Sequence, residues 1–442
     1  MRVAVALTSL VIAAVAAAPT PARAAQQGVN ADVGELAGDG PAMVAGTGAR
    51  WARVFMLWSQ IEPAPGVIDE RALDLYRQAG LALTARRVKL IVDVLGAPSW
   101  ASATGAAGGP PARPSAFADF LGRLAGRLRG AVAAYEVWNE EDAVKFWGAR
   151  PDAAVYARVL RLAYPRIKAA DPAATVVFGG LTGNDYRYLA AAYRHGARGS
   201  FDAVSVHTDL GCELRDPHEY VRDPGGRISQ WSFLGYRSVR RTMIAHGDRS
   251  PMWMTELGWS ATNVVCSLGV YAGQKPGGVS EQQQAAYLTR AYACLAADPY
   301  VPVALWFQLR DTISDEAAGI RYGLQRLDGT PRPAWGAFLA LRSGPPRERC
   351  DPWYAGPHVA LHLRRDGRAH DVLVVATVRA QLGVARVGVR LDGRTIERRR
   401  GSATSMMLRI PVQILARRRH IVTVVAVDTA GNGGKASRLT EP

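Results

Sequence analysis

The chain has 442 residues, a formal net charge of +16 and four cysteines. Such a basic excess is common in nucleic-acid-binding proteins, but only five of the 54 basic residues are lysine, and the arginines are scattered through helix-like and strand-like segments alike. From Cys350 onward there are 16 basic and 7 acidic side chains. Two interpretations stay open for this tail: it contacts an anionic polymer such as cell-wall material, or its arginines only solvate the surface.

The first 24 residues have the pattern of a secretory signal peptide. Arg2 supplies a positive charge, residues 3–18 are almost uninterruptedly apolar, and Ala22-Arg23-Ala24 has the small-x-small form of a cleavage site. A membrane anchor is the alternative, but the apolar run is shorter than the roughly 18 residues that a span needs and is followed by proline. We therefore expect an exported protein, for which nucleic acid is not a physiological target.

Residues 25–343 alternate short apolar runs with longer amphipathic ones. Eight runs are predicted as strands: Val29–Val33, Trp51–Leu57, Lys89–Leu95, Ala133–Trp138, Thr175–Gly179, Phe201–His207, Pro251–Glu256 and Val303–Phe307. Helical patterns lie between them: Ile68–Ala85, Pro114–Arg129, Ala153–Ala170, Tyr186–Gly196, Phe233–His246 and Ser280–Ala297. This alternation, repeated eight times, predicts an α/β fold with a closed (β/α)8 TIM barrel. No convincing long helix is found between the first two strands.

The C-terminal quarter has a different pattern. A last helix is expected at Pro333–Leu341, and residues 344–356 are expected to be a linker. Residues 357–442 then contain only strand-like runs: Val359–Leu363, Asp371–Val378, Ala385–Leu391, Ser405–Val412 and His420–Val427. This pattern is typical of a small all-β sandwich of the immunoglobulin type. The final strand is expected to end in a turn at Asp428–Asn432, without a role in chemistry.

Two glutamates end the fourth and seventh predicted barrel strands. Glu140 follows Trp138-Asn139, and Glu256 follows the apolar run that starts at Met252. All strands of such a barrel deliver their C-terminal residues to one shared mouth, so these carboxylates should face each other. A strand-end glutamate alone is more often a structural ion-pair partner, but a pair beside several tryptophans suits glycoside cleavage. That reaction needs one protonated and one ionised carboxyl group, and Asn139 can donate an amide hydrogen bond to a sugar 2-hydroxyl.

These motifs resemble the clan A glycoside hydrolases, in particular family 39 (β-xylosidase and related enzymes) and family 5 (cellulase and related enzymes). The resemblance covers residues 28–341 and implies that Glu140 is the general acid/base and Glu256 the nucleophile of a retaining enzyme. It further implies that Arg53 contacts the nucleophile and that His207 faces the substrate. One departure is Thr208, which stands where the clan often has a tyrosine that holds the nucleophile.

The same resemblance assigns aromatic side chains to the substrate cleft. Trp58 belongs to a W-x-x-I-E-P-x-x-G stretch in which Glu62 is expected to be structural. Trp100 matches an aromatic wall after strand three, and Trp306 matches the tryptophan that floors the −1 subsite. Sugar C–H faces stack on such rings, so a cluster of them at one barrel mouth favours a carbohydrate cleft.

The four cysteines form no zinc pattern and lie in the exported part of the chain. Two disulfides, or one disulfide and two buried thiols, are possible, and four cysteines permit three pairings. Because the first two follow strands six and seven, we expect Cys212–Cys266 at the mouth and Cys294–Cys350 between barrel and sandwich.

The expected function is a secreted, monomeric, retaining glycosidase that acts on an extracellular β-linked glycan without cofactor or metal. A carbohydrate-binding protein that has lost turnover, or an inverting or transglycosylating enzyme on the same scaffold, are the alternatives. A separation of about 5 to 5.5 Å between the two carboxyl groups is expected for retention, against about 6.5 to 9.5 Å for inversion.

Overall fold

The computed structural model describes residues 24–208, 216–223, 225–266, 276–354, 356–365, 371–380, 383–401, 403, 405–413, 419–429 and 433–440. The predicted signal peptide up to residue 23, Asp209 and Cys212 lie outside this part of the chain. Within the described residues, no helix is both long and apolar enough to cross a membrane.

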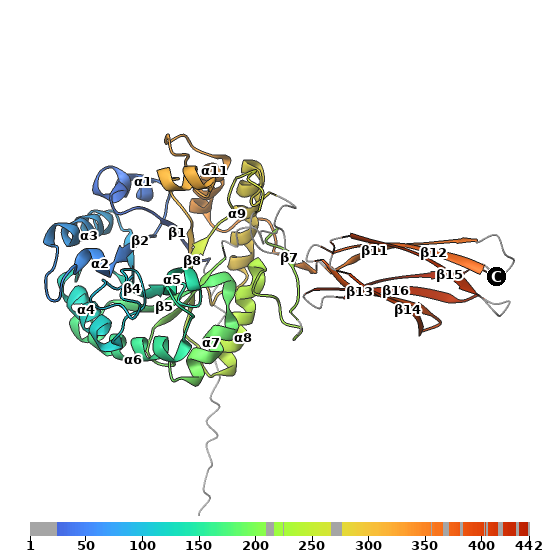
Figure 1. Cartoon of the computed structure of the whole chain (residues 1–442). Coiled ribbons are helices and arrows are strands. Elements are labelled where there is room, and N and C mark those ends of the chain that lie inside the picture. The colour runs from blue at the N-terminus through green and yellow to red at the C-terminus, as the bar shows by residue number, and fades with distance from the viewer. Residues whose placement is uncertain are drawn as a thin grey trace, which may run out of the picture.

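Eight parallel strands form a closed barrel (Figure 1). In order around the barrel they are β1 (Gln26–Asn30), β2 (Trp51–Leu57), β3 (Lys89–Leu95), β4 (Ala134–Asn139), β5 (Thr175–Leu181), β6 (Ala203–His207), β8 (Met252–Leu257) and β9 (Val303–Trp306). The predicted (β/α)8 barrel is confirmed, and β2 and β3 have the predicted bounds. The first strand begins at Gln26, three residues before the predicted start, because its first residues pair with β9 to close the barrel.

Helices surround the barrel. They are α1 (Gly40–Gly46), α2 (Trp58–Ile61), α3 (Glu70–Thr84), α4 (Pro114–Arg127), α5 (Val144–Trp147), α6 (Ala153–Ala170), α7 (Tyr186–Arg194), α8 (Tyr236–Ala245), α9 (Glu281–Ala296), α10 (Ile313–Ala318) and α11 (Pro333–Ala340). Local capping explains where several begin: Asp152 accepts from two backbone amides at the start of α6, and Ser280 with Gln283 forms a capping box on α9. The first connection contains a 3-10 helix (Glu35–Ala37) and the short α1, and no long helix, as the sequence indicated.

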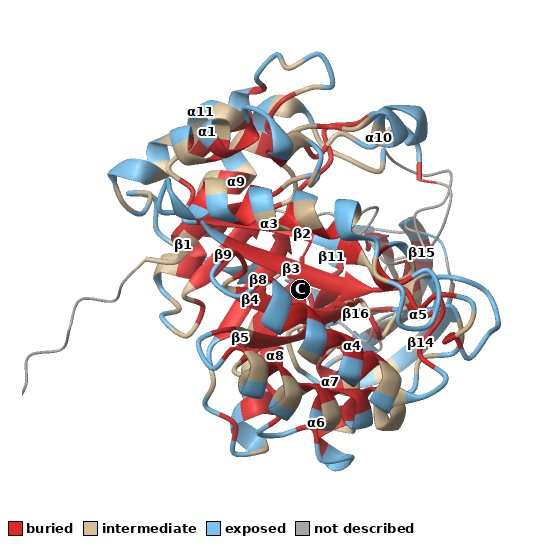
Figure 2. Cartoon of the chain, turned by 90° about the vertical axis from the view of Figure 1, so that its left-hand side faces the viewer, coloured by how far each residue is buried: buried red, intermediate tan, exposed pale blue. Residues whose placement is uncertain are grey.

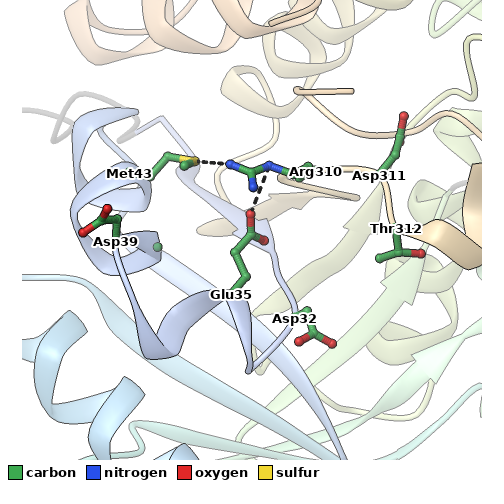
Figure 3. Close-up of a pocket in the computed structure, with 8 residues that line it drawn as sticks. Asp32, Glu35, Asp39, Met43, Arg310, Asp311 and Thr312 are labelled. Carbon is green, nitrogen blue, oxygen red and sulfur yellow. Dashed lines mark hydrogen bonds and ion pairs between the residues drawn. The ribbon is translucent and has the colours of Figure 1, made fainter. Parts of the chain in front are cut away.

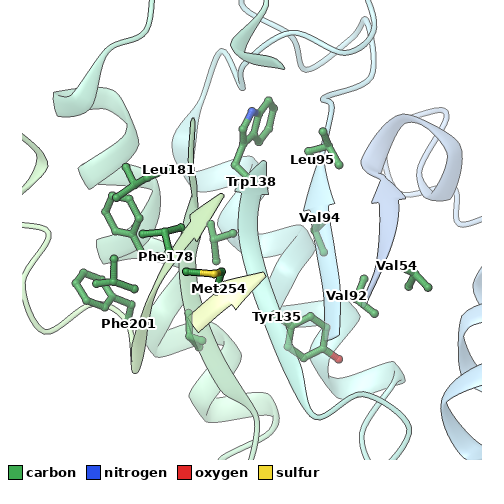
Figure 4. Close-up of a cluster of buried hydrophobic side chains, with 14 of the residues drawn as sticks. Val54, Val92, Val94, Leu95, Tyr135, Trp138, Phe178, Leu181, Phe201 and Met254 are labelled. Carbon is green, nitrogen blue, oxygen red and sulfur yellow. The ribbon is translucent and has the colours of Figure 1, made fainter. Parts of the chain in front are cut away.

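Alternate residues of each barrel strand serve two different cores. Val54, Val92, Phe178 and Met254 point outward and pack under the helices (Figure 4). The alternate positions of the strands point inward, and those at the bottom of the barrel form an apolar layer: Trp51, Ile91, Ala134, Val177, Ala203, Trp253, Val303 and Leu305. The buried strands and the exposed outer helix faces are distinguished in Figure 2. This two-residue period decides which side chains above that layer face the barrel axis.

The C-terminal region is an all-β domain of two antiparallel sheets. One sheet has the order β11 (His358–Arg365), β12 (Asp371–Arg379), β15 (Ser405–Gln413). The other has the order β14 (Arg394–Arg400), β13 (Val384–Leu391), β16 (Ile421–Asp428), β17 (Gly433–Leu439). The prediction of five strands was incomplete: β14 and β17 lie on the two edges of their sheet and are largely exposed, so they lack the apolar alternation that marks a strand.

The segment between the barrel and the β domain is held against the barrel at two places. A disulfide links Cys294 on α9 to Cys350, which confirms that predicted pairing. Just after it, β10 (Trp353–Tyr354) pairs in parallel with β7 (Glu219–Tyr220), a short strand in the connection that follows β6. Cys266 is also disulfide-bonded, and its predicted partner lies outside the described residues. The expected linker therefore contains a strand that is anchored on the barrel.

Candidate active site

Glu140 and Glu256 lie together at the C-terminal end of the barrel, which we call the mouth. Glu140 directly follows β4, and Glu256 is the penultimate residue of β8. One carboxylate oxygen of each, and one ring nitrogen of His207 on β6, all lie within 4.8 Å of one another. The closed barrel thus brings together two carboxyl groups that are 116 positions apart in sequence, as the strand pattern predicted.

Arg53 organises the floor beneath these carboxylates. Its fully buried guanidinium donates to Glu256 Oε1 at 2.7 Å, Glu136 Oε2 at 2.6 Å and Asp93 Oδ2 at 2.7 Å. Two amide oxygens also accept from it, each at 2.9 Å, on Asn30 and Asn139. We call these six residues the Arg53 cluster. All come from inward-facing positions of four different barrel strands and from the end of β8, so the cluster ties the barrel together around the predicted nucleophile.

The charges of the Arg53 cluster are mutually dependent. Burial alone would lower the pKa of Arg53, but Glu136, Asp93 and Glu256 together raise it above its ordinary value. Burial raises the pKa of Asp93 well above its usual range, against the opposing effect of Arg53. A guanidinium hydrogen bond stabilises the ionised form of a carboxylate. The 2.7 Å contact with Arg53 thus favours the ionised form of Glu256, the form that the predicted nucleophile requires.

Glu140 occupies a strained segment in a less polar place. Both Trp138, at φ +76°, and Glu140, at φ +44°, adopt the left-handed backbone conformation, which costs a non-glycine residue about 1–3 kcal/mol. Packing compensates: the Trp138 indole stacks edge-on against Phe117 and Trp147 and donates to a main-chain oxygen at 3.2 Å. Burial raises the pKa of Glu140 to about 7. Near neutral pH a substantial share of the Glu140 carboxyl groups is therefore protonated.

His207 lies between the two carboxylates. Its Nδ1 is 3.0 Å from Glu140 Oε1, and its Nε2 is 3.7 Å from Glu256 Oε1. The ring fits because Gly180 stands opposite: a Cβ there would lie 1.9 Å from Nε2. Burial lowers the pKa of His207, so the imidazole is neutral. The predicted site histidine thus contacts the acid residue directly.

Asn139 and Thr208 frame the same space. Because a guanidinium only donates hydrogen bonds, Asn139 turns its oxygen to Arg53, and its amide group is the end left for a sugar hydroxyl. Thr208, which replaces the tyrosine of the resembled clan, is buried, and its hydroxyl lies 3.4 Å from the main-chain oxygen of Glu256. The hydroxyl therefore does not hold the Glu256 carboxylate.

The predicted tryptophans have different surroundings. Trp100 is partly exposed beside the mouth, edge-on to Trp58. Trp58 and Trp306 are 0% exposed: Trp58 donates to Glu62 at 2.8 Å, and Trp306 points outward to the helix layer and donates to Tyr322 O at 2.9 Å. Contact of these two indoles with a sugar remains a prediction, and their complete burial does not favour it.

The site also contains residues that were not predicted from the sequence. Asn30, Asp93 and Glu136 share the inward face with Arg53, and the two-residue period from the apolar bottom layer would have identified them. The same period places Phe55 and Phe307 inward at the mouth. Phe55 is 38% exposed with the Arg53 guanidinium 4.7 Å from its ring centre, and Phe307 is half-buried against Tyr322. These rings are further candidates for stacking on a sugar.

A cavity of about 410 Å³ lies near the same end of the barrel, between the connections that follow β1 and β9 (Figure 3). It is lined by Asp32, Glu35, Asp39, Gly40, Met43, Arg310, Asp311 and Thr312. Arg310 pairs with Glu35 at 3.4 Å across it. None of these residues belongs to the Arg53 cluster. Elsewhere, His218 lies beside Cys294 and Cys350, whose sulfurs are joined and so do not offer thiolates to a metal.

No known protein-family profile matches the chain, and no curated protein is significantly similar in sequence. Its structure is similar to a family 39 glycoside hydrolase from Bacteroides cellulosilyticus WH2, with a TM-score of 0.55 and 18% identity, covering 89% of this chain and 82% of that one. The fold is that of the family 39 and family 5 glycoside hydrolases. Two further structures agree: a monomeric β-xylosidase from Caulobacter crescentus CB15 (TM-score 0.51, 17% identity, 89% and 96% covered) and GH5_18 from Streptomyces cattleya in complex with GlcNAc (TM-score 0.54, 20% identity, 74% and 83% covered).

Proposed function

We propose that this protein is a retaining glycoside hydrolase that cleaves β-linked glycans by double displacement. The observation that carries the proposal is the pair of carboxyl groups at the mouth, with oxygens within 4.8 Å of each other, where Glu140 has a raised pKa and Glu256 contacts the Arg53 guanidinium. This approach of the two oxygens supports direct attack by Glu256, for which the carboxyl groups lie about 5 to 5.5 Å apart. The printed name of one structural neighbour, β-xylosidase, supports a β-linked substrate.

In the proposed reaction, Glu140 transfers its proton to the departing glycosidic oxygen while Glu256 attacks the anomeric carbon. Arg53 holds the attacking carboxylate in place, and the amide of Asn139 is free to bind the sugar. Water then attacks the glycosyl-enzyme, Glu140 takes the proton of that water, and Glu256 leaves. Each proton that Glu140 gives is thus returned, and no cofactor is needed.

The stereochemistry tests this proposal. A panel of aryl β-glycosides should identify one that the protein hydrolyses, and ¹H NMR of the first product should show the β-anomer. The α-anomer as first product would mean inversion and would refute Glu256 as nucleophile. Saturable binding of oligosaccharides without turnover of any panel member would instead support the alternative, a carbohydrate-binding protein on the same barrel.

We further propose that the protein works outside the cell as a monomer. The N-terminal pattern of a signal peptide supports export, and the Cys294–Cys350 disulfide is compatible with an oxidising compartment. The printed description of one neighbour as monomeric supports the oligomeric state. N-terminal sequencing of protein recovered from the culture medium should give Ala25 as the first residue, and recovery with the cell pellet only would contradict export.

We also propose that the β domain holds an acidic polysaccharide on its four-stranded sheet. Strand pairing sets Arg386 opposite Arg400 and places Arg398 beside them, because cross-strand partners share one side of a sheet. The exposed outer side of the sheet, which we call the basic face, carries five cations: Arg386, Arg390, Arg398, Arg400 and Lys435. Among the residues that the structure describes, none of the five has an ion-pair partner. Opposed like charges cost stability unless an anion lies over them.

Affinity electrophoresis in gels that contain a soluble polyuronate tests the basic face. Replacing Arg386, Arg398 and Arg400 by glutamine should weaken retardation about tenfold at low salt, and added salt should weaken it for the unmodified protein. The matched control replaces Arg364, Arg379 and Arg409, which lie exposed on the outer side of the other sheet. An equal loss in both triple variants would show that only the overall charge matters. Retardation by DNA but not by polyuronate would point to nucleic acid instead.

A further inference from the structure

A continuous chain of hydrogen bonds connects Glu140 to the Arg53 cluster. Glu140 Oε1 is 3.0 Å from His207 Nδ1, and His207 Nε2 is 3.1 Å from Thr255 Oγ1. Thr255 Oγ1 is 2.8 Å from Glu136 Oε1, and Glu136 Oε2 accepts from Arg53 at 2.6 Å. His207, Thr255 and Glu136 are all 0% exposed, so water does not compete for these bonds. These hydrogen bonds therefore connect the Arg53 guanidinium to the predicted acid, Glu140, without an intervening water molecule.

The direction of each hydrogen bond follows from the Arg53 end. The 2.6 Å ion pair with the buried Arg53 cation favours the carboxylate form of Glu136, and both oxygens of a carboxylate only accept hydrogen bonds. Thr255 has a single hydroxyl proton and must give it to Glu136. The remaining lone pairs of Thr255 then accept from His207 Nε2–H and from the adjacent Ser205 hydroxyl. Glu136 thereby dictates which nitrogen of His207 carries the proton.

The consequence reaches Glu140. A neutral imidazole with its proton on Nε2 has a bare lone pair on Nδ1, which faces Glu140 Oε1. That contact is a hydrogen bond only while Glu140 is protonated, and it opposes ionisation once the proton has left. Burial of Glu140 acts in the same direction and outweighs the opposing effects of Lys145, Arg53 and Thr182, so that the pKa of this residue is raised to about 7.

We propose that Thr255 and His207 are positioning residues that keep the catalytic proton on Glu140 by fixing His207 as the Nε2–H tautomer. The inference rests on the proposed glycosidase function only for the role of that proton; the tautomer itself is independent of it. In the first step the chain stabilises the acid form of Glu140. In the second, the lone pair on Nδ1 favours return of a proton from water to Glu140.

Replacing Thr255 by valine tests the chain, because valine has nearly the same shape and lacks the hydroxyl. His207 Nε2–H then loses its acceptor, and the Nδ1–H tautomer, which donates to ionised Glu140, becomes favourable. The alkaline limb of the kcat/KM profile, which reports the proton of Glu140 in the free enzyme, should move down by about one pH unit. The loss should be large for a glycoside with a poor leaving group and small for a dinitrophenyl glycoside, which needs no acid. Thr255→Ser should restore the limb.

Two measurements keep this test decisive. Thr242→Val, which removes a buried hydroxyl on α8 away from the site, should leave the limb unmoved. ¹⁵N NMR of histidine-labelled protein, assigned with His207→Asn, should show the Nε2–H tautomer in the unmodified protein and its loss in Thr255→Val, without any substrate. A protonated Nδ1 in the unmodified protein, or an unmoved limb in Thr255→Val, would overturn the proposal. The expected tautomer in a protein without activity would instead refute the proposed function alone.

Discussion

Replacing Glu256 with glutamine is expected to lower kcat by about 10⁵-fold or more, the scale seen when an enzyme loses its covalent nucleophile. The amide has the shape of the carboxylate but does not attack an anomeric carbon, and it removes the charge that Arg53 Nη1 contacts at 2.7 Å. Release of the aryl group from the glycoside identified in the substrate panel measures the effect. Circular dichroism of the variant should be unchanged.

The variant of the second carboxylate gives a different pattern. Glu140→Gln should lose about 10²- to 10⁴-fold on a poor leaving group, since general acid catalysis is removed, and much less on a dinitrophenyl glycoside. Glu316→Gln is the matched control, because Glu316 lies exposed on α10 in the connection after β9 and forms its ion pair with Arg321, away from the Arg53 cluster. If Glu256→Gln kept one-hundredth of the activity or more on any substrate, Glu256 would not be the nucleophile.

The second large effect is on stability. Arg53→Met is expected to lower the free energy of unfolding by about 3–5 kcal/mol, because it leaves buried carboxylates without their cation. Glu136 and Asp93 are 0% exposed and have no water to replace the guanidinium. Arg53→Lys keeps the charge but not the fork of donors that serves five acceptors, so a smaller loss is expected. Urea unfolding followed by tryptophan fluorescence measures both.

An exposed ion pair provides the comparison for Arg53. Arg166 on α6 pairs with Asp119 on α4, with 36% and 51% of the two side chains exposed. Arg166→Met should change the free energy of unfolding by about 1 kcal/mol or less, since water replaces the lost contact. A loss of under about 1 kcal/mol in Arg53→Met as well would contradict the view that the Arg53 cluster holds the barrel together.

Much of the architecture could be read from local pattern. The alternation of apolar strands and amphipathic helices predicts the barrel because each element must bury one face, and this need is written in the spacing of its residues. The edge strands β14 and β17 escaped because they are exposed on both sides and carry arginine, glycine and lysine where a buried strand has apolar residues. Exposure removes the signal on which the pattern depends.

Some residues of the site could likewise be predicted from the sequence, and others could not. Glu140 and Glu256 could be identified from their strand positions, since charged residues are costly in otherwise apolar runs, and Arg53 from the resemblance to clan A. Trp58 directly follows β2 and Trp306 ends β9, but both indoles pack toward the helices, whereas Phe55 and Phe307 face the mouth. The position of a residue along its strand predicts how close it lies to the mouth of the barrel. Whether its side chain points toward the barrel axis or toward the helices follows only from counting in steps of two from the apolar bottom layer.

The sequence by itself determined that eight strands would deliver two carboxyl groups to one mouth, because parallel strands share a direction and the glutamates stand at their ends. It did not determine the protonation state of either carboxyl group. Only closure of the barrel placed the Arg53 guanidinium against Glu256 and buried Glu140 beside a neutral His207. Protonation depends on burial and on neighbours brought from distant strands, and so the tertiary structure supplies the physical basis for the unequal roles that we propose for the two glutamates.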